Sequence, residues 1–139
     1  MKSPLIIFAL KCSVILYFAA CTGINEYASS VSATPQITKG AWKVDLFTEA
    51  ENDQTTNLKG YTLTFEPTGK ITATKNGEKI TGNWAEDDIL KIITINLDTK
   101  DAVLAKLNYS WSISKISKAA LSFKNTDDPS NGRLQITSL

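Results

Sequence analysis

An alternation of apolar and polar residues with a period of two dominates the chain from Ile37 onward and constrains its fold more than any other feature. Successive side chains on a β-strand point to opposite faces, so this pattern is typical of strands with one buried face. Its runs are rich in threonine, isoleucine and aromatic residues, which favour strands. We therefore expect an all-β domain. The alternating positions are Trp42, Val44 and Leu46; Tyr61, Leu63 and Phe65; Ile71 and Ala73; Ile80, Gly82 and Trp84; Ile93, Ile95 and Leu97; Tyr109, Trp111 and Ile113; Leu121 and Phe123; Leu134 and Ile136.

Turn residues separate these runs. Asn76-Gly77 predicts a type I′ hairpin, and Glu66-Pro67-Thr68-Gly69 predicts a tight turn with proline at its second position. Only the segment from Asp101 to Lys106 has the pattern of a helical turn. Short strands joined by hairpins favour a meander, and closure into a barrel removes exposed edge strands. The sequence thus predicts an eight-stranded up-and-down antiparallel β-barrel over residues 37–139.

Residues 1–20 have the pattern of a bacterial export signal. Lys2 precedes the first of two apolar runs, and Lys11 separates the first from the second; neither run is long enough to span a bilayer. Phe18-Ala19-Ala20-Cys21 resembles a lipobox, in which the cysteine is lipidated and becomes the mature N-terminus, although Phe18 replaces the usual branched aliphatic residue. Ordinary cleavage farther on, for example after Ala33, is the alternative and would discard Cys21.

Residues 21–36 are predicted to tether the domain to the lipid on Cys21. They are rich in serine, alanine and threonine and have little apolar periodicity, which is typical of a flexible linker. An N-terminal strand or helix packed on the domain is the weaker alternative, because the apolar positions are scattered.

Composition argues against several function classes. Fifteen basic and fourteen acidic residues leave no basic excess for nucleic-acid binding. The chain has no histidine, which is the commonest general base and metal ligand. Cys12 leaves with the export signal and Cys21 carries lipid, so no thiol remains for catalysis or zinc binding. We therefore expect no enzyme activity, no metal site and no cofactor.

Short motifs in a fixed order resemble a known family. Gly40-Ala41-Trp42, the stretch from Gly60 to Phe65, Gly82-Asn83-Trp84 and Leu134-Gln135-Ile136 resemble the small lipocalin-like domains of many Gram-negative envelope lipoproteins. The resemblance covers residues 40–139 and implies an eight-stranded barrel that allows an internal ligand site, without implying a reaction or substrate. In true lipocalins an arginine at the end of the last strand covers the first-strand tryptophan, whereas Arg133 starts the last strand here.

The resemblance and the lipobox together predict a cell-envelope location. A lipid such as palmitate on Cys21 would hold the chain at the outer membrane. No acidic run follows Cys21, so a periplasm-facing position is favoured over the cell surface.

The meander predicts where a ligand would bind. It places three long connections, residues 48–59, 98–106 and 124–131, at one rim, where barrels usually bind ligands. We expect Tyr61, Tyr109 and Trp111 to line a cavity there for a small apolar or amphiphilic ligand, with ordinary core packing as the alternative. Trp42 and Trp84 are expected to plug the opposite end.

The same loops are rich in acidic residues, which favours either a cation or basic peptide at the rim or simply solvated loops. These residues are Glu49, Glu51, Asp53, Asp98, Asp101, Asp127 and Asp128. Two hypotheses follow. The first is a lipid-anchored, non-enzymatic barrel that binds a small ligand at its loop-rich end. The second is a protein-interaction module, such as an envelope inhibitor, immunity factor or assembly component, with a packed barrel.

Overall fold

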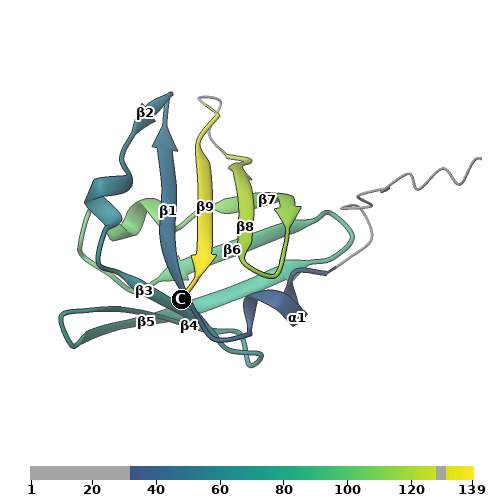
Figure 1. The fold of residues 1–139 in the computed structure, drawn as a ribbon, viewed down its shortest axis with the longest axis horizontal. Helices are drawn as coiled ribbons and strands as arrows, with labels where there is room; N and C mark the ends of the chain where they lie inside the picture. The colour runs from purple at the N-terminus through teal and green to yellow at the C-terminus, as the bar shows by residue number, and fades with distance from the viewer. Residues whose placement is uncertain (1–31, 128–130) are drawn as a thin grey trace, which may run out of the picture.

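A single antiparallel sheet closes on itself to form the domain. The computed structural model describes residues 32–127 and 131–139; residues 1–31, which include the predicted export signal, Cys21 and most of the predicted tether, and Asp128 lie outside them. The strands follow the order β2-β1-β3-β4-β5-β6-β7-β8-β9, and β1 also pairs with β9 (Figure 1). The predicted eight-stranded up-and-down barrel is therefore confirmed, with the short β2 as one extra strand.

The described strands and helical turns have the following bounds. The strands are β1 Ala41–Glu49, β2 Asn52–Asp53, β3 Thr62–Phe65, β4 Lys70–Lys75, β5 Glu78–Asp87, β6 Ile92–Leu97, β7 Ser110–Ile116, β8 Ala120–Asn125 and β9 Arg133–Ser138. The helical turns are α1 Thr34–Ile37, η1 Thr55–Leu58 and η2 Leu104–Leu107.

Local turn chemistry follows the sequence closely. Asn76 and Gly77 have φ values of 52° and 81°, as a type I′ turn requires, and they join Lys75 to its partner Glu78. The Gly69 amide donates to the Glu66 carbonyl at 3.0 Å and closes the tight turn between β3 and β4. The predicted helical turn is present as η2, whereas α1 and η1 were not predicted.

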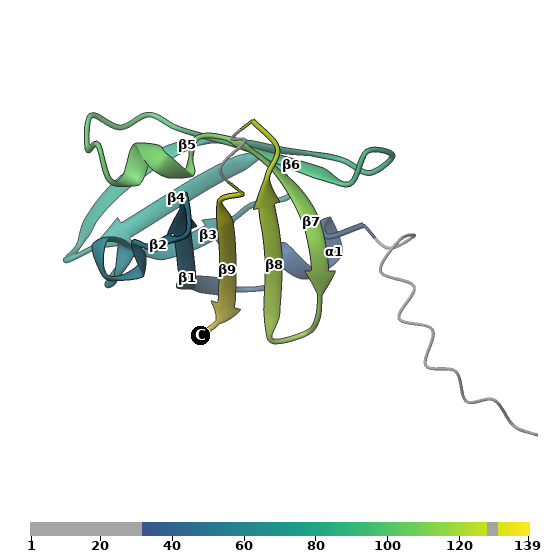
Figure 2. The ribbon, with the colours of Figure 1, turned by 90° about the horizontal axis from the view of Figure 1, so that it is seen from above.

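Twenty-two apolar side chains form one buried core, and none of the described polar or charged residues is fully buried. Two sets of helical residues cover the ends of the barrel (Figure 2). Ile37 of α1 is completely buried at the end from which the N-terminal segment leaves, which we call the N-terminal end. Leu58 of η1 and Leu104 and Leu107 of η2 are buried at the opposite, loop end. Apolar packing therefore extends from one end of the barrel to the other.

Two β-bulges interrupt the alternation of inward and outward side chains in β1 and β7. The β1 register shifts between Val44 and Leu46, so Leu46 is only half-buried and Phe47 takes the inward position. A second shift lies between Ile113 and Lys115 in β7; Ile113 before it is half-buried and packs against the core, as predicted, and Ile116 packs there beyond it. A bulge places two residues opposite one, which reverses the in-out alternation beyond it.

The predicted tether ends earlier than Gln36. Ser32 Oγ and the amides of Ala33 and Thr34 donate to the Glu86 carboxylate at 2.7–2.8 Å, and Thr34 Oγ1 also donates to it. Ala33 and Ile37 are completely buried. These two residues are four apart on one helical turn, so they share a face, but a segment this short carries too little periodicity to be recognised. Residues 32–36 thus belong to the domain.

Candidate functional site

The loop end is closed where the sequence predicts a mouth. Trp111 is 1% exposed, and its Nε1 donates to the Leu107 carbonyl of η2 at 3.0 Å. Tyr109 lies against the Trp111 ring edge-to-face at 6.4 Å between centroids but is 39% exposed. The structure thus brings Tyr109 and Trp111 together under η2 rather than around an open cavity. Their binding role stays a prediction.

Tyr61 contacts Asp101 and Lys75. Its hydroxyl donates to Asp101 Oδ2 at 3.1 Å, and Lys75 Nζ lies 4.8 Å from the centroid of its ring. Burial, with Asp101 adding to it, raises the pKa of Tyr61. A shallow hollow of about 310 Å³ opens beside the ring between Lys75 and Glu78. The contact with Asp101 ties the start of β3 to the η2 segment.

Both predicted plug tryptophans are buried near the N-terminal end. Trp42 donates from Nε1 to the Ile37 carbonyl of α1 at 2.7 Å. Trp84 donates from Nε1 to the Glu66 carbonyl at 2.9 Å and packs edge-to-face on Phe65. Each indole N–H thereby has a partner, which lets a large ring be buried at low cost.

Several of the predicted acidic rim residues organise their own loops. Asp53 accepts from the Thr55 amide, and Asp101 accepts from the amides of Val103 and Leu104. The Thr55 side chain, followed by its amide, lowers the pKa of Asp53, and the Val103 and Leu104 amides lower the pKa of Asp101. Lys106 forms an ion pair with Glu49 at 2.6 Å. Within residues 32–127 and 131–139, no three acidic, histidine or cysteine residues come together as a metal site.

A groove lies on the outside of the barrel, over β1, β7, β8 and β9. It has a volume of about 350 Å³, and we call it the outer groove; its lining includes Leu46, Ser114, Ser122, Lys124, Arg133 and Gln135. The two bulged segments border the groove: Leu46 follows the bulge in β1, and Ser114 is the extra residue in β7. Bulges commonly re-aim side chains next to functional sites.

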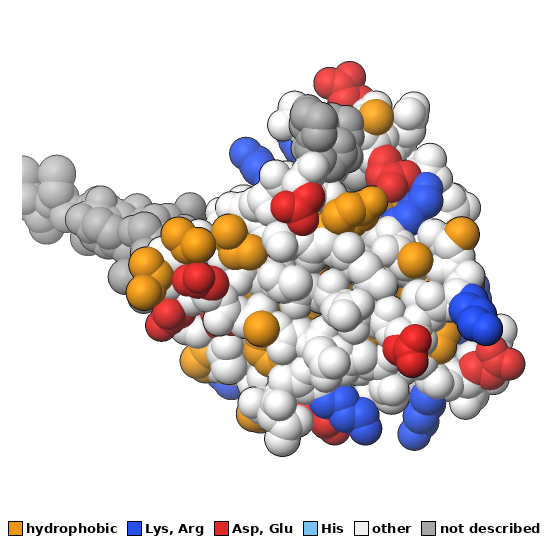
Figure 3. Space-filling model, turned by 180° about the vertical axis from the view of Figure 1, so that it is seen from behind, with side chains coloured by type: hydrophobic (Ala, Val, Ile, Leu, Met, Phe, Trp, Pro, Cys, Tyr) orange, Lys and Arg blue, Asp and Glu red, His pale blue; other side chains and the backbone are white. Residues whose placement is uncertain are grey.

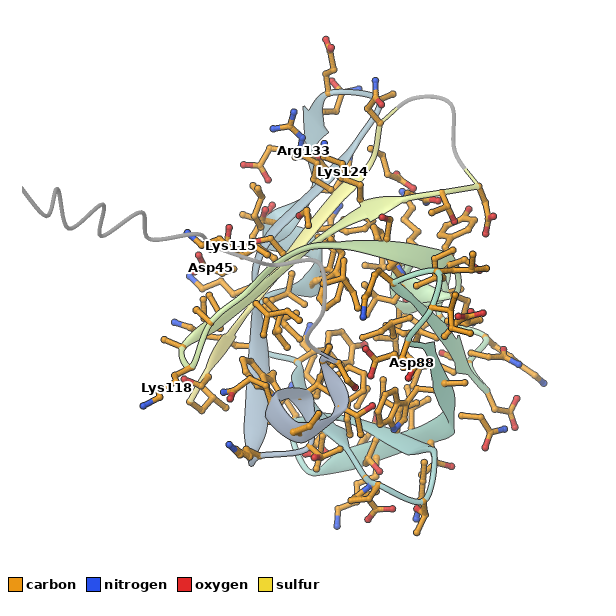
Figure 4. The ribbon with its side chains drawn as sticks, turned by 90° about the vertical axis from the view of Figure 1, so that its right-hand side faces the viewer. Asp45, Asp88, Lys115, Lys118, Lys124 and Arg133 are labelled. Atoms are coloured by element: carbon orange, nitrogen blue, oxygen red, sulfur yellow. The ribbon has the colours of Figure 1, made fainter. Side chains whose placement is uncertain are left out.

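Strand register arranges the outer groove in two rows. Gln135 pairs with Leu46 on one side and with Ser122 on the other, which makes a neutral row across β1, β9 and β8. Two residues farther along, Lys124 of β8 lies directly opposite Arg133 of β9. Figure 4 shows these two side chains close together near the loop end, with Lys115 and Lys118 farther down the same side of the barrel.

The two cations of the outer groove face each other across β8 and β9. No carboxylate in the described part of the chain lies within ion-pair distance of Lys124 or Arg133. Glu51 lines an adjoining hollow with Arg133, and Asp45 is exposed in the β1 bulge, so nearby acids only partly offset the charge. Like charges directly opposite on neighbouring strands are destabilising. Such a pair is therefore suited to an anionic ligand.

Sequence reasoning missed the outer groove because its parts are distant in the chain. Leu46 and Arg133 are neighbours only through the pairing of the first and last barrel strands. The bulges that form its walls have no simple signature in the sequence. The one available signal was Arg133 itself, which the register places beside Thr48 and so at the opposite end of β1 from Trp42, as predicted.

Comparison with known proteins supports the architecture. No family model matches the chain, and no curated protein matches it. The chain is similar to the crystal structure of a DUF4847 family protein from Bacteroides vulgatus ATCC 8482, with a TM-score of 0.60 and 16% sequence identity. The match covers 78% of this chain and 98% of that chain. No helix among the described residues is long and apolar enough to cross a membrane. At this identity the likeness shows the fold alone, a small β-barrel domain.

Proposed function

We propose that the chain is an envelope lipoprotein, anchored through Cys21, whose barrel is a protein-interaction module that binds an acidic segment of a partner in the outer groove. The observation that carries the proposal is the Lys124–Arg133 pair, placed directly opposite across β8 and β9 without a counter-charge among the described residues. The lipocalin-like resemblance and the lipobox around Cys21 support the anchor and an outer-membrane, periplasm-facing location.

Packing favours this proposal over a ligand held inside the barrel. Leu58, Leu104 and Leu107 occupy the loop end, and the Trp111 indole donates to the η2 backbone instead of facing an opening. A small apolar or amphiphilic ligand would have to displace these side chains. The outer surface is open to a partner without any such rearrangement.

The chemistry of the outer groove suits carboxylates presented by a protein. The Arg133 guanidinium can hold a carboxylate through two parallel hydrogen bonds, while Lys124 supplies a point charge beside it. Ser122 and Gln135 add neutral donors in the next row. Each of the eight barrel strands that close the sheet has a neighbour on both sides, so a partner in the outer groove would be recognised by side chains instead of by an added strand.

Site-specific crosslinking in intact cells tests the groove. A photoreactive amino acid replaces Ser114, which is exposed at the groove wall, in the full chain expressed in its own host. We expect a discrete crosslinked protein that disappears with the double variant Lys124→Glu/Arg133→Glu and weakens as salt is raised. The matched control is Lys70→Glu/Lys79→Glu, which makes the same change in charge on β4 and β5 and should retain the crosslink.

Other outcomes would contradict the groove. A crosslink that survives Lys124→Glu/Arg133→Glu would show that these cations do not bind the partner. A crosslink to lipid or lipopolysaccharide phosphate would assign the groove to a different anion. A discrete small molecule that remains with the purified barrel would favour the internal-ligand alternative.

The anchor is tested separately with Cys21→Ser. We expect the normal chain to carry a diacyl or triacyl modification on Cys21 by mass spectrometry and to sediment with membranes. The variant should lack the modification and leave the membrane fraction. An unmodified Cys21 in the normal chain would contradict the anchor without affecting the argument for the groove.

A further inference from the structure

The hairpin between β5 and β6 ends in two large apolar side chains that project into solvent. Ile89 is 87% exposed and Leu90 is 65% exposed, which places them among the most exposed large hydrophobic residues described. Their turn is well defined, because Asp87 Oδ1 accepts from both of their amides at 3.0 and 2.8 Å. Seen from behind, hydrophobic side chains gather at this edge of the molecule, with acidic ones beside them (Figure 3). Adjacent apolar residues held outward in this way favour a surface that can cover them.

This hairpin tip lies beside the point where the N-terminal segment meets the barrel. Glu86, one residue before Asp87, binds Ser32, Ala33 and Thr34. Figure 2 shows α1 and the β5–β6 hairpin on the same side of the barrel, and Asp88 faces the viewer near α1 in Figure 4. Along the sheet the tip is followed by β7, because the Ile113 amide donates to the Lys91 carbonyl at 2.8 Å and Ile92 pairs with Ser112.

We infer that Ile89 and Leu90 dip into the boundary between headgroups and acyl chains of the membrane that carries the anchor. The inference rests on the proposed lipid on Cys21. Cys21 lies eleven residues before Ser32, so the intervening chain reaches at most about 40 Å when fully extended. Because Glu86 fixes where that chain joins the barrel, the hairpin tip lies beside the attachment point and stays within reach of the bilayer surface.

A tethered domain needs only a weak additional contact to keep the hairpin tip at the membrane. The tether makes the encounter of the tip with the membrane intramolecular, so a weak apolar contact is enough to hold it. Amphipathic segments seat apolar side chains about 5–10 Å into this boundary.

The charges at the tip predict what kind of contact this is. Asp87 and Asp88 outweigh Lys91, the one basic residue of the turn, so the tip is not attracted to anionic headgroups. Burial of Ile89 and Leu90 is then the driving term. The contact should form equally in vesicles with and without anionic lipid.

Fluorescence quenching in vesicles tests the inference. The full lipidated chain is reconstituted into phosphatidylethanolamine–phosphatidylglycerol vesicles with Ile89→Cys, and the new thiol is labelled with a small fluorophore. We expect lipid-borne nitroxide to quench most of its emission. The matched control is Lys79→Cys near the other end of β5, ten residues before Ile89 and so about 30 Å distant, which should stay unquenched.

A further variant separates apolar contact from mere proximity. Asp88→Cys labelled in the same way should lose its quenching when Ile89→Ser and Leu90→Ser are added, while the melting temperature stays unchanged because both side chains are exposed. Persistent quenching would overturn the inference, as would an unquenched Ile89→Cys label on a chain whose Cys21 is acylated. An unacylated Cys21 would instead remove the proposed anchor, so the two failures are distinguishable.

Discussion

Gly82 shows how one missing side chain permits the barrel to close. It lies in β5 between Ile71 of β4 and Leu97 of β6. A Cβ atom at this position would lie 2.1 Å from the Asn96 carbonyl oxygen and 2.6 Å from the Leu97 Cα. Backbone atoms at such distances cannot move aside as a flexible side chain would. The close approach therefore requires glycine for steric reasons.

Gly82→Ala should consequently weaken the pairing of β5 with β6. We expect the free energy of unfolding to fall by about 1–3 kcal/mol, the usual cost of forcing extra atoms into a packed site. Urea denaturation measures the change, and Thr81→Ala, at the exposed neighbouring position, serves as the control. Equal stability of the Gly82 variant and the native chain would contradict the close approach.

Glu86 gives the N-terminal segment a pH dependence. Partial burial raises the pKa of Glu86, but the donors Thr34, Ser32 and Ala33 outweigh it and leave the pKa below the ordinary value of 4.5. A group whose pKa is lower in the folded state stabilises that state above its unfolded pKa. This contribution is lost as the pH falls through the folded pKa.

We therefore expect hydrogen exchange at the amides of Ala33 and Thr34, corrected for intrinsic rates, to accelerate as the pH falls below 4.5. Glu86→Gln should exchange faster at neutral pH and lose the acid-dependent step, because its amide cannot ionise. Asp88→Asn, on the same hairpin but without a hydrogen bond to the segment among the described residues, is the control. An identical pH profile in Glu86→Gln and the native chain would assign the protection to another group.

At the scale of elements, β8 and β9 carry two like charges opposite each other at the proposed anion site. Lys124 and Arg133 repel each other across the pair, and Lys124→Glu converts the repulsion into an attraction. We expect this variant to be more stable by about 0.2–1 kcal/mol, as cross-strand charge pairs are, and to lose the proposed partner. Thermal melts and the crosslinking assay measure the two effects. A variant that is destabilised, or that keeps its partner, would contradict the role given to the pair.

Elements differ in how far the sequence alone predicts them. The strands and the Asn76-Gly77 hairpin were predictable because their signals are local: a period of two and a turn that requires positive φ. The position of Leu46 was mispredicted because a bulge depends on the partner strand. The contact between Ser32 and Glu86 joins residues 54 apart, and no local pattern encodes it. The candidate groove was missed for the same reason.

At the scale of the whole molecule, the pairing of β1 with β9 joins the first and last strands, so the stability of each strand depends on the other. Trp42 lies opposite Ser138, and Thr48 lies opposite Arg133, so the seam runs along most of both strands. Without it, β1 and β9 would both present unpaired edges. The barrel should therefore unfold as one cooperative unit.

Truncation tests that dependence. A chain that ends at Asn131 lacks β9, and we expect it to lose the cooperative urea transition and to aggregate through its exposed edges. Circular dichroism and light scattering follow the two effects. Removal of Leu139 alone, which is 72% exposed, should be tolerated. A cooperative transition in the shorter chain would show that the remaining strands form a stable sheet by themselves.

The Glu86 contact also determines how the domain would respond to mechanical load. A pull on the chain before Ser32 reaches the hydrogen bonds to Glu86 and the short α1 before it reaches the first barrel strand. These few bonds would yield first and release a short length of chain, while the β1–β9 seam stays intact. With the anchor proposed at Cys21, this short segment would take up tension on the tether before the barrel itself is strained.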